Sequence, residues 1–112
     1  MKVVAKFPAD MDARTEYKLM KSPVVKRMSD AIDSIIEVGA WLAYTDTDSR
    51  TGEDREVLLI AAKDGEMFAT VSAVFRREFK DIVEHFGDDV GAIKVIGGTS
   101  KAGRNFITCT IE

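Results

Sequence analysis

The residues best suited to chemistry lie in one stretch, GGTSKAGRNF at positions 97–106, which holds three glycines together with Lys101 and Arg104. A glycine-rich loop with a lysine can bind nucleotide phosphates when Lys and Ser or Thr follow the second glycine and a helix comes next. Gly98 and Gly103 have the required separation, but an arginine and an asparagine follow them, and the residues beyond alternate like a strand. We therefore predict a hairpin loop that carries two cations, and not a nucleoside triphosphate site.

Two aromatic residues are predicted to share the polar faces of their strands. In residues 105–112 apolar side chains occupy the odd positions, which places Phe106 with the threonines, and the alternation in residues 66–72 likewise sets Phe68 apart from the apolar side chains. Trp41 lies on the less apolar side of its strand, where an exposed and a core position remain equally open because bulges shift strand parity. Exposed rings stack on bases while cations contact phosphates in single-strand binding surfaces. The cations that we assign to such a surface are Arg55, Lys63, Lys94, Lys101 and Arg104.

Other kinds of site fail on their residues. The acidic loop at 46–54 begins like a calcium loop, but Arg50 occupies the fifth position and Val57 that of the bidentate glutamate. His85 has no Ser or Cys partner that the sequence identifies, and Cys109 alternates with apolar residues as a small core residue does. One cysteine and one histidine do not make a zinc site. We therefore expect no enzyme site, no metal and no cofactor.

The elements that must position these side chains are mainly strands. Strand patterns occur at 34–44, 55–62, 66–72, 92–96 and 105–112. An amphipathic helix is predicted at 73–86, with Ser72 as its N-cap and Gly87 at its end. Three strands, a helix and two strands is the order of the five-stranded OB barrel, which binds ligands over its second and third strands. We predict a mainly β chain with this OB fold over residues 31–112, and one helix between strands three and four.

Residues 1–30 are predicted to form an N-terminal arm outside the OB domain, with Asp12 capping a short helix over 13–22. The arm has seven basic and four acidic residues, a local charge of +3 in a chain of net charge -3. Residues 92–106 also carry +3, whereas residues 46–56 hold five acids and two arginines. Such asymmetry is typical of a basic binding face on an acidic body.

Parts of the chain resemble the small single-stranded DNA-binding proteins of bacteriophages, including those of protein-primed phages. The resemblance is carried by AAKDGEMFATVS at 61–72, by the helix after it, and above all by IKVIGGTSKAGRNFITCTI at 93–111. It covers about residues 38–111. It implies an OB-like fold that coats single-stranded DNA during phage replication, without catalysis or cofactor. The acidic loop at 46–54 departs from the family pattern and would repel phosphates. The residues that match family binding surfaces in type are Tyr44, Phe68, Lys101 and Phe106.

Together these features predict a sequence-nonspecific single-stranded DNA-binding protein in which Trp41, Tyr44, Phe68 and Phe106 stack on bases. Replication proteins and further copies of the chain are additional candidate partners. Two alternatives stay open, namely an OB-fold module that docks another protein and an RNA-binding OB domain. No apolar run approaches the roughly 20 residues that cross a bilayer, so we expect no membrane partner and a cytoplasmic location, that of the host cell if a phage encodes the chain.

Overall fold

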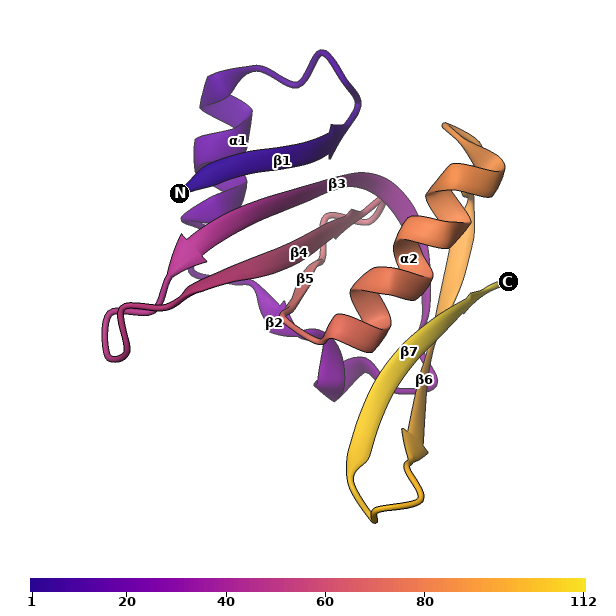
Figure 1. Cartoon of the computed structure of the whole chain (residues 1–112). Coiled ribbons are helices and arrows are strands. Elements are labelled where there is room, and N and C mark those ends of the chain that lie inside the picture. Colours follow the sequence, from indigo (N-terminus) through magenta and orange to yellow (C-terminus); the bar gives the residue numbers. More distant parts are fainter.

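The computed structural model describes all 112 residues as a curled, mainly β fold with two α-helices (Figure 1). The α-helices are α1 (Ala13–Met20) and α2 (Ala73–Phe86), and a short 3₁₀ helix, η1, spans Met28–Ala31. Neither α-helix has the length and apolar character needed to cross a membrane. The strands are β1 (Lys2–Phe7), β2 (Lys26–Arg27), β3 (Ile35–Thr47), β4 (Asp54–Ala62), β5 (Met67–Thr70), β6 (Ala92–Thr99) and β7 (Asn105–Ile111).

The strands form one sheet that curls without closing. Its order is β2-β5-β4-β3-β6-β7, and β1 pairs with β3 outside this path. All pairs are antiparallel except β2 with β5. The long strand β3 belongs to both halves of the sheet, because its first residues pair with β6 and its later residues with β4 and β1. Because the end strands β2 and β7 do not pair with each other, the sheet is a half-barrel with an open edge, consistent with an OB-like fold.

The five predicted strands correspond to β3 through β7, and the expected β4–β5 and β6–β7 hairpins form. The prediction of five strands is nevertheless wrong in number. Residues 1–30 add β1 and β2, whose short segments carry no clear strand pattern. Counted along the chain, α2 therefore lies between the fifth and sixth strands and not between the third and fourth.

Both α-helices begin at the predicted caps. The carboxylate of Asp12 accepts a hydrogen bond from the Thr15 N–H at 2.8 Å. Hydrogen bonding by the side chain and the backbone of Thr15 lowers the pKa of Asp12. The hydroxyl of Ser72 accepts a hydrogen bond from the Phe75 N–H at 3.2 Å. Gly87 ends α2 with a φ of 62°, a left-handed conformation that favours glycine. Local sequence therefore determines where each helix starts and where α2 ends.

The sheet buries apolar side chains on both of its faces. The main core includes fourteen buried residues, among them Ile60 of β4 and Phe75 of α2. Successive residues of β4 alternate between this core and a separate group of buried residues, which explains the uninterrupted apolar run of that strand. We call the separate group the small cluster; it consists of Met11, Leu42, Tyr44, Val57 and Leu59.

A bulge at Gly39 divides β3 between the two groups. The register with β4 shifts between Val38 and Ala40, and a Cβ on Gly39 would lie only 3.2 Å from the carbonyl oxygen of Ala61. Before the bulge Val38 belongs to the main core, and after it Leu42 belongs to the small cluster. The single apolar face that the alternation of this strand predicts is therefore split in two, because the bulge reverses the parity.

Candidate nucleic-acid interface

A groove lies between the end of β5 and the β6–β7 hairpin, where the sheet stays open. It consists of two hollows of about 840 and 470 Å³ that share Ser29, Thr70 and Val71. The larger hollow lies between η1, the end of β5 and the β6–β7 hairpin, and the smaller one reaches the ends of β3 and β4. We call the two hollows together the seam groove. Its lining includes Arg27, Ile32, Tyr44, Arg55, Val71 and Phe106.

Phe106 presents an exposed aromatic ring to the seam groove. It is the cross-strand partner of Gly98, and its ring lies over that glycine, since a Cβ on Gly98 would come within 2.5 Å of the ring Cζ. The residue is still 37% exposed. A ring that is supported by backbone on one side and open to solvent elsewhere is suited to stacking on a base.

Two aliphatic side chains extend the apolar surface beside Phe106. Val71, which follows β5, is 50% exposed, and Ile32, which follows η1, is 43% exposed. Both line the larger hollow. Ile32 lies against the backbone at Gly97, where a Cβ would be 2.9 Å from its Cδ1. Exposed apolar side chains gathered in one hollow indicate a binding surface.

Four cations lie in or next to the seam groove. Arg27 and Arg55 line the smaller hollow, while Lys101 and Arg104 lie exposed in the turn of the β6–β7 hairpin. Gly103 allows this turn with a φ of 78°. None of the four cations forms an ion pair within the chain. Their charges are therefore available to phosphate groups.

The strongly acidic loop between β3 and β4 stays outside the seam groove. None of its residues from 47 to 54 lines either hollow. Asp46 is the acidic residue that β3 contributes to the smaller hollow. Asp46 pairs across the strands with Arg55. Burial raises the pKa of the Tyr44 hydroxyl; Asp46 raises it further, while Arg55 lowers it. Tyr44 is thus neutral at physiological pH, and the adjacent acid is balanced by an arginine.

The structure brings five of the nine predicted binding residues into or next to the seam groove. Phe106 lies in it, and Lys101 and Arg104 lie at its hairpin end. Tyr44 and Arg55 line its other end, although Tyr44 is only 7% exposed because it also belongs to the small cluster. Residues distant in the sequence therefore meet here through the curl of the sheet.

Two of the other predicted residues lie on different surfaces. Trp41 packs edge to face on Phe79 of α2, with ring centroids 5.7 Å apart. The sequence leaves an exposed and a core position open for Trp41, and the structure shows the core position. Lys94 lies on β6 between its cross-strand partners Ile35 and Thr110, and it lines neither hollow of the seam groove.

The prediction that Phe68 is exposed is wrong. Phe68 is 6% exposed and belongs to the main core, where Ile60 is its cross-strand partner. The alternation misled because both faces of β4 and β5 are covered, so the side opposite Phe68 is apolar as well. Val71, which the alternation assigns to the core, is instead exposed in the seam groove.

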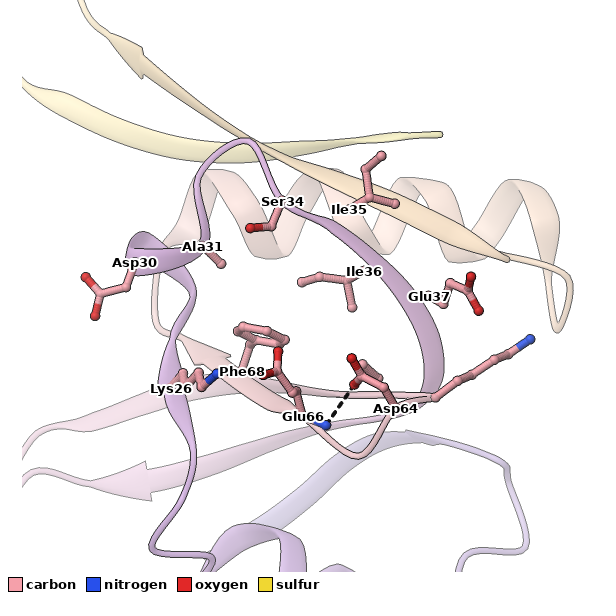
Figure 2. A pocket seen from close by; sticks show the side chains of 12 residues that line it. Lys26, Asp30, Ala31, Ser34, Ile35, Ile36, Glu37, Asp64, Glu66 and Phe68 are labelled. Carbon is pink, nitrogen blue, oxygen red and sulfur yellow. Dashed lines mark hydrogen bonds and ion pairs between the residues drawn. The ribbon is translucent and has the colours of Figure 1, made fainter.

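Phe68 and Lys63 line a third hollow, of about 480 Å³, whose charged side chains are mainly acidic (Figure 2). Lys26 forms an ion pair with Glu66 at 2.7 Å, and its Nζ lies 6.0 Å from the centre of the Phe68 ring. Asp64 accepts a hydrogen bond from the Glu66 N–H at 2.9 Å. Because carboxylates outnumber cations here, this hollow is a poorer site for phosphates than the seam groove.

Sequence reasoning missed three contributors to the seam groove, namely Arg27, Ile32 and Val71. The basic balance of residues 1–30 is a signal for Arg27, but the sequence predicts an arm outside the domain there, whereas β2 pairs with β5 in the sheet. No periodic pattern distinguishes Ile32 and Val71 from core residues, since each directly follows a short element. Their exposure depends on the open edge of the sheet, which only the tertiary structure shows.

A family model described as Phage Single-stranded DNA-binding protein matches residues 24–112 of the chain. The matched residues include the whole lining of the seam groove and leave out β1 and α1. No curated protein and no solved structure shows a significant match to the chain.

Proposed function

The chain belongs to the family of phage single-stranded DNA-binding proteins, and we propose that it holds single-stranded DNA in the seam groove. It coats and protects the strand during phage replication in the host cytoplasm, without sequence preference and without a cofactor. On this proposal β3 to β7 are the five strands of an OB barrel formed by residues 31–112, and residues 1–30 are an N-terminal segment that packs on it, with β2 paired to β5 and Met28 in the main core.

The main support is the position of Phe106. Its exposed ring rests on Gly98 at the hairpin end of the groove, and Val71 and Ile32 continue the apolar surface. A base that stacks on this ring is held by its aromatic face, which every base has. Binding through such a surface therefore discriminates little between sequences.

The four unpaired cations supply the phosphate contacts. Lys101 and Arg104 act at the hairpin end, and Arg27 and Arg55 act at the other end of the groove. In a chain of net charge -3 these local cations offset repulsion between the DNA and the acidic remainder of the molecule. Binding of this kind releases counterions, so its affinity falls as the salt concentration rises.

Titration of a fluorescein-labelled oligothymidine with the full chain tests the function directly. We expect saturable fluorescence anisotropy at micromolar protein and low salt, with unlabelled DNA competing better than RNA of the same length. The label is placed on the DNA because Trp41 packs on α2 and not in the groove. No anisotropy change at low salt would refute the proposed function, and stronger competition by RNA would assign the groove to RNA.

Removing the hairpin cations is expected to reduce the salt dependence of binding. In the Lys101→Ala, Arg104→Ala double variant, the slope of log affinity against log salt concentration should decrease by about 1.4, or about 0.7 per lost phosphate contact. The matched control is Arg77→Ala, Lys80→Ala, which removes the same charge from exposed positions on α2. If both double variants change the slope equally, the hairpin has no specific phosphate contacts.

A further inference from the structure

Residues 8–23, between β1 and β2, cover the outer face of β3 and β4; we call this segment the cover. Figure 1 shows α1, the helix of the cover, beside β1 on the side of the sheet away from α2. Met11 of the cover is a member of the small cluster, and Leu19 and Met20 of α1 pack against this cluster. The cover therefore occupies a face of the sheet that is apolar and would otherwise be open.

The cover is weakly attached to the face that it occupies. Within it only Met11 is buried, and α1 contributes no buried residue. A helix of eight residues has little stability of its own and depends on packing to persist. The cover can therefore detach at a smaller cost than a core helix such as α2.

One side chain of β1 fastens the cover. The Nζ of Lys6 donates a hydrogen bond to the Met11 carbonyl oxygen at 2.8 Å and forms an ion pair with Glu16 at 2.9 Å. Both side chains are partly shielded, with 30% of Lys6 and 15% of Glu16 exposed. Because β1 is itself paired with β3, Lys6 connects the cover to the sheet.

The face beneath the cover continues the seam groove. Tyr44 and Val57 belong to the small cluster and also line the smaller hollow. The strands beneath the cover include β4, the second strand of the proposed barrel, and OB folds bind ligands over their second and third strands. The cover lies outside the family match, which begins at residue 24, directly after the cover ends.

We propose that the face beneath the cover is a second part of the DNA-binding surface, which single-stranded DNA reaches by displacing residues 8–23. This inference rests on the proposed function. With the cover displaced, Tyr44 offers a ring to a further base, next to Arg55 and continuous with the groove. The cover and the DNA compete for the same apolar face, so the apparent affinity of that face for DNA equals its intrinsic affinity multiplied by the fraction of molecules in which the cover is displaced.

Hydrogen exchange of the full chain with and without oligothymidine tests this displacement. DNA should slow the amide exchange of the β6–β7 hairpin and accelerate that of α1, because α1 loses its packing when the cover detaches. Slower hairpin exchange together with unchanged or slower α1 exchange would overturn the inference and leave the proposed function intact. No change in either segment would instead mean that the groove does not bind DNA.

Cross-linking the cover provides a second, independent test. A bismaleimide joined to cysteines in the Lys6→Cys, Glu16→Cys variant holds the cover in place, and Cys109 does not compete because it is buried and its pKa is raised to about 12. The cross-linked protein should bind oligothymidine about tenfold more weakly than the same variant before cross-linking, the loss expected for one stacked base. Equal affinity of the two forms would overturn the inference.

Weakening the attachment should have the opposite effect. Glu16→Gln removes the ion pair with Lys6, and Asp10→Asn removes the same charge from an exposed position of the cover that makes no hydrogen bond or ion pair through its side chain. We expect Glu16→Gln to bind DNA about two- to fivefold more tightly than Asp10→Asn, the range that corresponds to a partly exposed ion pair. Equal affinities would show that the attachment does not limit binding.

Discussion

Replacement of Phe106 by alanine is expected to weaken the binding of single-stranded DNA by about 1 to 3 kcal/mol, which is about 5- to 150-fold in affinity. The loss arises because the ring that supports a base is removed while the cations of the hairpin remain. The salt dependence of binding should therefore stay as it is. Anisotropy titrations with labelled oligothymidine at several salt concentrations measure both quantities.

Phe86 provides the matched control for Phe106. It is 40% exposed against 37% for Phe106, but it lies at the end of α2 and lines neither hollow of the seam groove. Phe86→Ala should leave the affinity unchanged. Gly98→Ala keeps the Phe106 ring but forces it away from its support, since the new Cβ would lie 2.5 Å from Cζ. If Phe106→Ala binds as well as Phe86→Ala, the ring does not stack on DNA.

Replacement of Phe75 by alanine is expected to lower the free energy of unfolding by about 3 to 5 kcal/mol. Phe75 is fully buried at the start of α2, and it belongs to the main core that α2 shares with the sheet. Alanine would leave a cavity that the surrounding strands fill only in part. Urea denaturation followed by far-ultraviolet circular dichroism measures the change.

Phe86→Ala is also the matched control for the effect of Phe75→Ala on the free energy of unfolding. Phe86→Ala, at an exposed position of α2, should change the free energy of unfolding by about 0.5 kcal/mol or less. A Phe75→Ala variant as stable as Phe86→Ala would mean that α2 does not anchor the core. If the affinity of Phe75→Ala for DNA falls only in proportion to the fraction of unfolded protein, the substitution affects stability and not the binding surface.

Much of the fold follows from local patterns in the sequence. Hydrophobic periodicity locates β3 to β7 and α2, and the caps Asp12 and Ser72 form the hydrogen bonds that their residue types favour. The hairpin at 97–106 and its exposed Phe106 are also where alternation places them. These features depend on interactions between residues close in the chain, which a single sequence contains.

The errors arise where a second layer covers the sheet. Alternation assigns one face of a strand to the core, but β4 and β5 are covered on both faces, so Phe68 is buried. Val71 lies one residue beyond β5, outside the covered part of the sheet, and is exposed. Within β3, the bulge at Gly39 changes which alternate residues face the main core. A single sequence does not show which segment will cover a second face, because that depends on contacts between distant residues.

The seam groove was predictable only in part for the same reason. Its hairpin end follows from residue type and spacing, whereas the contributions of Arg27 and Ile32 require the chain around η1 to lie along the open edge of the sheet. Residues 24–32 form no regular element longer than four residues, so no periodic signal predicts where they lie. Tertiary contacts alone bring them to Phe106.

The bulge at Gly39 has a consequence for protein engineering. The buried residues of β3 before Gly39 belong to the main core and those after it to the small cluster, while Trp41 packs on the main core from the opposite face of the strand. Residues 1–23 can therefore be exchanged for another segment, such as a fluorescent or affinity-tagged peptide, with compensating changes in the half of β3 after the bulge and at Val57 and Leu59 of β4. The DNA-binding module would thus accept a new N-terminal attachment while β6 and β7 keep their native sequence.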